Sequence, residues 1–255
     1  MNPRVAIVDS GVNAGHPHVG PLFAGARVRS APDGTPSIEE GIAAARDEIV
    51  HGTACAGLVR WLAPAAEIVA VRIFDAVLRV EFARLAPALD FARDRGCQVV
   101  NLSLGASGDA APAEAREALE RLLDGGAWVV CAAGPRLDGW PASHPRTLAV
   151  APDRSLASGV HGVIEGAPFP RPKPLFLAAP YPRPMPGLPR ERNLAGSSFA
   201  AAALSGILAR DRVEGTTALD PRLSALVRFP DLDTWRAARA QDPATGRGDD
   251  AEEGA

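Results

Sequence analysis

Three residues of the types that nucleophilic catalysis requires stand where predicted strands or helices begin or end. Asp9 follows the apolar run 4–8, His51 opens a segment of small residues, and Ser198 opens an Ala/Leu-rich segment typical of a buried helix. A serine hydroxyl is a weak nucleophile until an imidazole accepts its proton, and a carboxylate fixes the tautomer of that imidazole and stabilises its cation. Together the three residues predict a Ser/His/Asp catalytic triad.

Each residue also has a plainer explanation. Serine is a common helix cap, and aspartate is a common turn residue. A lone histidine at the start of a helix is more often structural than catalytic. The order along the chain narrows the choice, because α/β-hydrolases run Ser, acid, His around GxSxG, and Ala200 replaces the second glycine here. The chymotrypsin order is His, Asp, Ser, so the order Asp, His, Ser indicates a third known arrangement.

The elements that must position these residues follow from hydrophobic periodicity. The predicted strands are 4–8, 67–74, 97–104, 127–133, 148–151 and 175–179. The predicted helices are 37–46 within a surface segment 24–48, 51 to about 64, 80–95, 113–123, the one at Ser198, 223–227 and 232–240. This alternation predicts an α/β fold, a mostly parallel twisted sheet with helices on both faces, in a single domain spanning 1–240. Active sites of such sheets lie at the carboxyl edge.

The segment 166–192 interrupts this rhythm as a Pro/Arg-rich loop insertion with nine prolines. Prolines cannot donate ladder hydrogen bonds, so only 175–179 is expected to be strand. Its basic residues outnumber the single acid Glu191; they are Arg171, Lys173, Arg183, Arg190 and Arg192. The segment is either a stiff solvated loop or a collar that binds acidic peptide. Residues 241–255 predict an acidic disordered tail.

Composition excludes several function classes. The 255 residues are 47% hydrophobic and 22% charged, with a net charge of −3, which favours a large core and disfavours a nucleic-acid binder. No apolar run reaches the 18 to 20 residues of a membrane span. The three cysteines lie in apolar settings and favour reduced thiols. Together with an N-terminus that carries no signal peptide or pro-segment, they predict a cytoplasmic protein. No metal-ligand spacing is found, so no cofactor is expected; calcium is compatible with the chain, but no calcium loop is recognisable.

Three blocks of the sequence resemble the subtilisin-like serine peptidases (subtilases). They are VAIVDSGV at 5–12, HGTACAG at 51–57 and GSSFAA at 196–201, which are similar to the blocks that bear the catalytic Asp, His and Ser of the family. The resemblance spans about residues 4–210. It implies that the catalytic residues are Asp9, His51 and Ser198, with Ser198 rather than Ser197 as the nucleophile.

The resemblance also implies how an extended substrate is held. Ser103, Leu104 and Gly105 would pair with the substrate backbone. The wall of the specificity pocket would consist of Ala132, Ala133 and Gly134. Residues 140–142 would lie near its floor, where Trp140 is expected to shorten a pocket open to apolar side chains.

One residue departs from the family pattern at a catalytic position. Subtilases follow Ala-Ala-Gly with Asn, whose amide stabilises the oxyanion, and here Pro135 stands in its place. Proline has neither that amide nor a backbone N–H. The loss of one oxyanion donor costs roughly 10²–10³ in kcat. The Ser198 backbone N–H remains as a donor, and Asn193 and His144 are candidates to supply another.

These features favour a subtilase-type endopeptidase with a narrow substrate range, such as one peptide or protein precursor whose leader is removed. The alternative is a catalytically silent peptide-binding module or a partner subunit of a processing complex. Esterase or other acyl-transfer activity is a third interpretation. A nucleic acid or a membrane is not expected among the partners.

Overall fold

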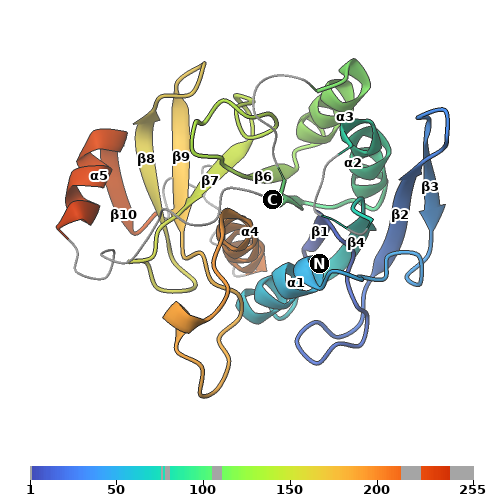
Figure 1. Ribbon diagram of the computed structural model, residues 1–255, viewed down its shortest axis with the longest axis horizontal. Helices are drawn as coiled ribbons and strands as arrows, with labels where there is room; N and C mark the ends of the chain where they lie inside the picture. The colour runs from blue at the N-terminus through green and yellow to red at the C-terminus, as the bar shows by residue number, and fades with distance from the viewer. Residues whose placement is uncertain (1, 76, 78–80, 105–110, 214–224, 242–255) are drawn as a thin grey trace.

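A computed structural model describes residues 2–75, 77, 81–104, 111–213 and 225–241. The described strands form one sheet in the order β10-β8-β9-β7-β6-β5-β1-β4-β2-β3 (Figure 1). Neighbouring strands are parallel except in the pairs β2–β3 and β8–β9. The strands are β1 Arg4–Asp9, β2 Ala24–Ser30, β3 Pro36–Glu40, β4 Glu67–Arg72, β5 Val99–Leu102, β6 Trp128–Ala132, β7 Leu148–Pro152, β8 His161–Ala167, β9 Lys173–Ala178 and β10 Val227–Asp231.

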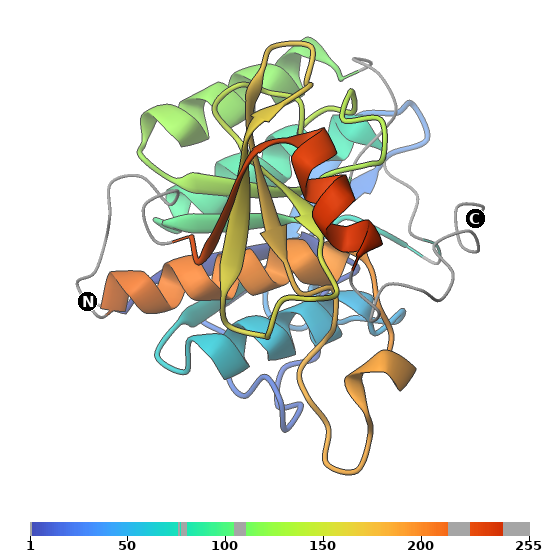
Figure 2. The ribbon, with the colours of Figure 1, turned by 90° about the vertical axis from the view of Figure 1, so that its left-hand side faces the viewer.

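Helices cover both faces of this sheet, as predicted (Figure 2). Side chains of α2 and α3 pack into the core on one face, and those of α1 and α4 pack into the core on the other. The helices are α1 His51–Leu62, α2 Leu85–Asp94, α3 Ala113–Asp124, α4 Ser197–Val213 and α5 Leu232–Ala240, with single 3-10 turns at Phe82–Arg84 and Arg190–Arg192. The α/β fold class is therefore confirmed, whereas the boundary at residue 240 stays a prediction.

The central strand and two neighbouring helices show why small and apolar residues recur. Residues 5–8 of β1 are completely buried, because a parallel strand in mid-sheet is covered on both faces. Helix α1 packs directly against α4. A Cβ atom at Gly206 of α4 would lie 2.9 Å from Cβ of Leu62, so only glycine permits this approach. The small residues thus bring the two helices that carry His51 and Ser198 side by side.

Two predicted helices are wrong. Residues 37–46 do not form a helix, because β2 and β3 pair as an antiparallel hairpin closed by a turn at Asp33 and Gly34, whose φ is +84°. The described part of 223–227 leads into β10, which pairs in parallel with the unpredicted strand β8. Both edge strands depend on sheet neighbours that periodicity does not reveal.

Other predictions are confirmed or lie outside the described residues. Cys55, Cys97 and Cys131 are free and buried. Residues 242–255 of the predicted tail are not among the described residues. No helix in the described part of the chain is long and apolar enough to cross a membrane.

Candidate active site

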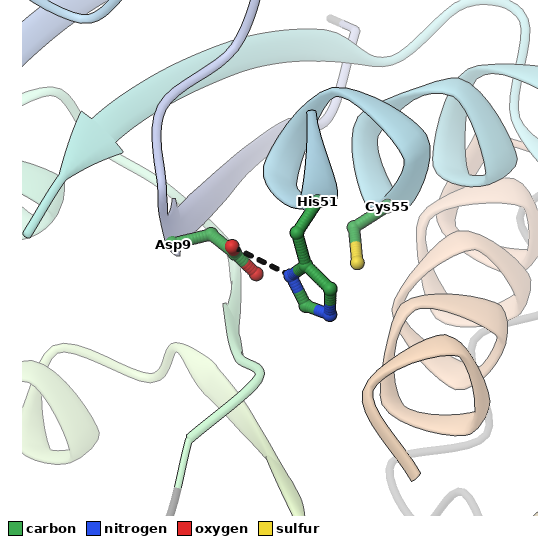
Figure 3. A group of neighbouring side chains, drawn as sticks. All are labelled: Asp9, His51 and Cys55. Atoms are coloured by element: carbon green, nitrogen blue, oxygen red, sulfur yellow. Dashed lines mark hydrogen bonds and ion pairs between the residues drawn. The ribbon is translucent and has the colours of Figure 1, made fainter. Parts of the chain in front are cut away.

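Asp9 and His51 are held together by a hydrogen bond at the carboxyl end of β1 (Figure 3). Oδ1 of the fully buried Asp9 lies 2.7 Å from Nδ1 of His51 and accepts a second hydrogen bond, of 2.6 Å, from the Ser10 N–H. A carboxylate only accepts, so Nδ1 carries the proton and Nε2 is left free to accept one. This is the tautomer that a general base requires.

A glycine permits the close approach of β1 and α1. His51 is the first residue of α1, and a Cβ atom on the next residue, Gly52, would lie 2.2 Å from the Gly11 carbonyl oxygen and 3.0 Å from Cβ of Asp9. Any other residue would force the helix away from the strand. Gly52 therefore sets the distance between the carboxylate and the imidazole.

A second buried carboxylate, Asp47, which was not among the predicted site residues, fixes the start of α1. Its Oδ1 accepts from Ser10 Oγ at 2.9 Å, Ile49 N at 3.0 Å and Val50 N at 2.8 Å. Its Oδ2 accepts from the backbone N–H and the hydroxyl of Thr53, at 2.8 and 2.6 Å. These contacts join the loop after Asp9 to the helix that begins at His51. An Asp shortly before a predicted helix is a capping signal that could have revealed it.

The charges near His51 determine its protonation. Burial lowers the pKa of His51, but the hydrogen bond to Asp9 and the negative charges of Asp9 and Asp47 outweigh burial and raise the pKa above its ordinary value. Burial raises the pKa of Asp47, but hydrogen bonds from Thr53, Ser10 and Val50 outweigh burial and lower the pKa below its ordinary value. This carboxyl therefore stays ionised near neutral pH.

Replacement of Asp47 by asparagine is expected to shift the pH dependence of the site. A general base at His51 must be neutral to accept a proton, so the activity that it would support is expected to decline as pH falls through the pKa of His51. Loss of the Asp47 charge lowers that pKa, and the acid limb of the kcat/KM profile moves to lower pH. Asparagine also leaves a buried N–H without an acceptor, which costs about 1–3 kcal/mol in the free energy of unfolding. The pH profile and urea unfolding measure the two effects; an unshifted acid limb would contradict the electrostatic role.

Val50, which immediately precedes His51, adopts a strained backbone conformation. Its φ is +74° and its ψ is −6°, in the left-handed region that a β-branched residue rarely occupies. The side chain is 56% exposed, so packing does not explain the conformation. The Asp47 contact to the Val50 N–H holds the turn in place.

Replacement of Val50 by glycine is expected to stabilise the fold. The left-handed conformation costs roughly 1–2 kcal/mol for a side chain with a Cβ atom, and glycine avoids this cost while losing up to about 1 kcal/mol in backbone entropy. A net gain of up to about 1 kcal/mol should appear in urea unfolding. Ile42→Gly is the matched control, because Ile42 is β-branched and 42% exposed but has no positive φ. Equal destabilisation by both substitutions would show that the backbone of Val50 is not strained.

Ser198 lies in the first turn of α4, partly exposed. The ring of the next residue, Phe199, is centred 5.8 Å from the ring of His51. Among the described residues no hydrogen bond joins the Ser198 hydroxyl to His51. Such bonds are often long in unliganded enzymes and tighten when substrate binds. The structure thus brings the helix start that carries Ser198 next to the Asp9–His51 pair.

A polar network connects β5 to this helix start. Ser103 Oγ donates to the Ser198 carbonyl oxygen at 3.4 Å and accepts from Asn101 Nδ2 at 2.8 Å. Asn101 Oδ1 in turn accepts from Ser205 Oγ of α4 at 3.1 Å. Asn101 and Ser205 are completely buried, so the network fixes α4 against the strand beside β1.

The residues predicted to bind substrate lie at the same edge of the sheet as Asp9. Strands β5 and β6 continue from β1 in parallel register, with Val8 opposite Leu102 and Leu102 opposite Cys131. Ser103 and Leu104 follow β5, and Ala132, Ala133 and Gly134 form or follow the end of β6. Gly105 is not among the described residues.

Trp140 is part of the core. It is 2% exposed, and its ring is centred 5.8 Å from that of Phe82, the first residue of the 3-10 turn before α2. Its effect on the depth of a pocket stays a prediction.

Pro135 is exposed and occupies the second position of a turn in which Leu137 N donates to Gly134 O at 3.1 Å. This position favours proline but offers no donor. His144 is wrong as a replacement donor, because its Nε2 is 2.9 Å from Glu120 Oε1 on α3 and its Nδ1 accepts from the Arg146 N–H. Asn193 Oδ1 accepts from the Leu194 N–H, which leaves its amide NH₂ group to donate elsewhere.

Among the described residues, Asp9, His51 and Cys55 form a group that could be considered for a metal. Their ligand atoms all lie within 4.8 Å of one another, and His51 Nδ1 lies only 2.7 Å from Asp9 Oδ1. Burial, and then the charge of Asp9, raise the pKa of the Cys55 thiol well above its ordinary value. Because the thiol keeps its proton and Nδ1 is engaged by Asp9, the group suits proton transfer better than metal binding.

Comparisons with known proteins agree with this geometry. A model of the subtilase family, Peptidase_S8, matches residues 1–155. Thermitase of Thermoactinomyces vulgaris is 30% identical over 161 residues, 58% of this chain and 54% of thermitase. The major intracellular serine protease of Bacillus subtilis (strain 168) is 27% identical over 222 residues, 82% of this chain and 67% of that protein. The chain spans 54% and 40% of the lengths of thermitase and subtilisin E.

Solved structures share the fold. Sphericase superposes with a TM-score of 0.63 at 20% identity, over 85% of this chain and 79% of sphericase. The protease domain of PatA gives 0.61 at 22% identity, covering 87% of this chain and 84% of that domain. The prenylagaramide maturation protease PagA gives 0.57 at 22% identity, covering 86% and 80%.

Proposed function

Because the chain belongs to the subtilase family, we propose that it is a serine endopeptidase that cleaves an extended peptide through an acyl-enzyme. The observation that carries the proposal is the 2.7 Å hydrogen bond between the fully buried Asp9 carboxylate and His51 Nδ1, formed next to the helix start that bears Ser198. The pair supplies a general base in the required tautomer, and a serine such as Ser198 needs such a base to become a nucleophile.

The proposed steps give each of these groups the role that its chemistry allows. His51 Nε2 accepts the Ser198 hydroxyl proton as Oγ attacks the scissile carbonyl, and Asp9 stabilises the imidazolium. The Ser198 backbone N–H, in the first turn of α4, is the proposed donor to the oxyanion that forms. His51 then gives the proton to the departing amine, and an acyl-enzyme remains. Water, deprotonated by His51, hydrolyses that ester and regenerates the serine.

The expected substrate range is narrow and comprises one or a few peptide or protein precursors, handled in the cytoplasm. Pro135 removes one oxyanion donor, which makes rapid general proteolysis chemically costly. Two proteins of the same fold are the protease domain of PatA and the prenylagaramide maturation protease PagA. The three free, buried cysteines support a reducing compartment. Efficient digestion of unfolded casein would contradict a narrow range.

Labelling with a fluorophosphonate probe, measured by intact mass, tests the proposal. A single adduct is expected on the wild-type protein and none on Ser198→Ala, with circular dichroism to verify that both are folded. No adduct on folded wild-type protein would overturn the proposal and favour the silent peptide-binding module. An adduct with ester turnover but no peptide cleavage would instead indicate an acyl-transfer enzyme.

A further inference from the structure

Lys173 is the only lysine in a sequence that contains 27 Lys and Arg residues in total. The prediction that Lys173 lies with the arginines of the Pro/Arg-rich loop is wrong. Lys173 is the first residue of β9 and is only 6% exposed. A buried cation is expensive unless its charge and its donors are satisfied. The buried ammonium therefore needs acceptors inside the protein, which a position in a surface loop would not require.

The Lys173 ammonium lies among oxygen atoms of one loop. Nζ donates to the carbonyl oxygens of His144 at 2.6 Å and Thr147 at 2.8 Å, and to the Thr147 hydroxyl at 3.1 Å. The Thr147 hydroxyl donates onward to the Pro141 carbonyl oxygen at 2.9 Å. The Phe169 ring closes the remaining side, with its centre 5.0 Å from Nζ. Three protons thus meet three acceptors and an aromatic face.

This arrangement suits an ammonium ion rather than a guanidinium. Lysine presents a compact charge with three donors around one atom, whereas arginine presents a wider, planar fork of donors. Burial lowers the pKa of Lys173 to about 8, so the ammonium form still predominates near neutral pH. No carboxylate of the described residues bonds to Nζ, and the charge is balanced by peptide dipoles.

The loop that these contacts gather is the connection from β6 to β7, residues 133–147. Its first residues are the predicted pocket wall, Ala133 and Gly134, followed by Pro135. Its outer side is tied to α3 by contacts of His144 and Arg146 with Glu120, which is about half exposed. Exposed ion pairs contribute little to stability. The buried Lys173 contacts are therefore the stronger constraint on the end of the loop that enters β7.

We propose that Lys173 is a positioning residue whose ammonium acts as a tethered cation, holding the carbonyl oxygens of His144 and Thr147 and thereby ordering loop 133–147, which begins with the predicted wall of the substrate pocket. The consequence for substrate binding rests on the proposed peptidase function, whereas the ordering of the loop does not. The role of Lys173 is therefore tested first without activity.

Hydrogen exchange measured by mass spectrometry tests the ordering. Lys173→Met, which keeps the length of the side chain but removes charge and donors, should accelerate exchange in peptides covering 133–147 by at least tenfold, with β1 and α1 unchanged. Lys173→Arg should not restore protection, because the planar guanidinium fork does not match the three oxygen acceptors of His144 and Thr147 around Nζ. Glu120→Gln is the matched control on the exposed side of the same loop and should change exchange by less than twofold. Unaltered exchange in a folded Lys173→Met protein would overturn the proposal.

Cation rescue distinguishes a lost positive charge from a general packing defect. In Lys173→Ala, ammonium or potassium chloride should restore protection of residues 133–147, whereas tetramethylammonium chloride at the same ionic strength should not. If the variants fail to fold, the wild-type protein still decides. With ¹³C-labelled lysine it gives a single side-chain Cε signal, expected to titrate below the ordinary lysine pKa. A signal that titrates as a free lysine would contradict the burial of the Lys173 ammonium among these oxygen acceptors.

Kinetics then connects the loop to substrate. In Lys173→Met, KM for a cleaved peptide should rise about tenfold with kcat changed less than threefold, and fluorophosphonate labelling of Ser198 should keep its rate. A fall in kcat with unchanged KM would contradict a role in the pocket wall. If the wild-type protein cleaves no peptide, the proposed function fails, while the exchange experiment still measures the role of Lys173.

Discussion

Asp9→Asn is expected to reduce kcat about 10⁴-fold while the protein remains folded. Asp9 Oδ1 accepts from both His51 Nδ1 and the Ser10 N–H, so the carboxylate fixes the imidazole tautomer and stabilises its cation. Asparagine removes the charge, and its NH₂ group, when turned toward His51, favours the tautomer whose Nε2 already carries a proton. Such an imidazole cannot accept the proton of Ser198.

The measurement is kcat for a cleaved peptide together with the fluorophosphonate labelling rate, both of which should fall. Asp47→Asn is the matched control, because it neutralises a second buried carboxylate of the same cluster that touches Ser10 and Thr53 but not the His51 ring. Its loss should be far smaller than that of Asp9→Asn. A decrease of less than tenfold in Asp9→Asn would show that Asp9 is not the orienting group.

Pro135→Asn is expected to raise kcat by up to about 10²–10³-fold, because it returns a side-chain amide to the position where the family stabilises the oxyanion. Pro135 is exposed, and it lies in a turn that accepts most residues at this position, so the substitution should cost little stability. The gain should appear in kcat rather than KM, because the oxyanion develops only in the transition state.

Pro135→Ala separates the side-chain amide from the backbone N–H. Alanine restores the N–H and frees the turn but provides no amide, so its kcat should stay within threefold of wild type. A large gain in Pro135→Ala would assign the effect to the backbone. No gain in Pro135→Asn would indicate that another donor, such as the Asn193 amide, already occupies the oxyanion position, which Asn193→Ala would then reveal as a loss of kcat.

The sequence by itself determined the fold class and the residues of the Asp9–His51 pair. Two local patterns can be recognised in the sequence alone: a run of apolar residues that ends in Asp9, and a helix of small residues that begins at His51. The alternation of strands and helices then requires both residues to meet at one edge of a parallel sheet. In the structure they do meet there, with His51 Nδ1 2.7 Å from Asp9 Oδ1.

Only the tertiary structure decided which other polar residues matter. Asp47 and Lys173 belong to segments that the sequence assigns to the surface, yet they are only 4% and 6% exposed. Their burial depends on acceptors and donors that converge from separate elements: the loop after β1 and the start of α1 around Asp47, and loop 133–147 around Lys173. Hydrophobic periodicity records which face of an element is covered, but not where the hydrogen bonds of a buried charge are found. For the same reason the strands β8 and β10, which exist through pairing with distant segments, emerged only in the folded chain.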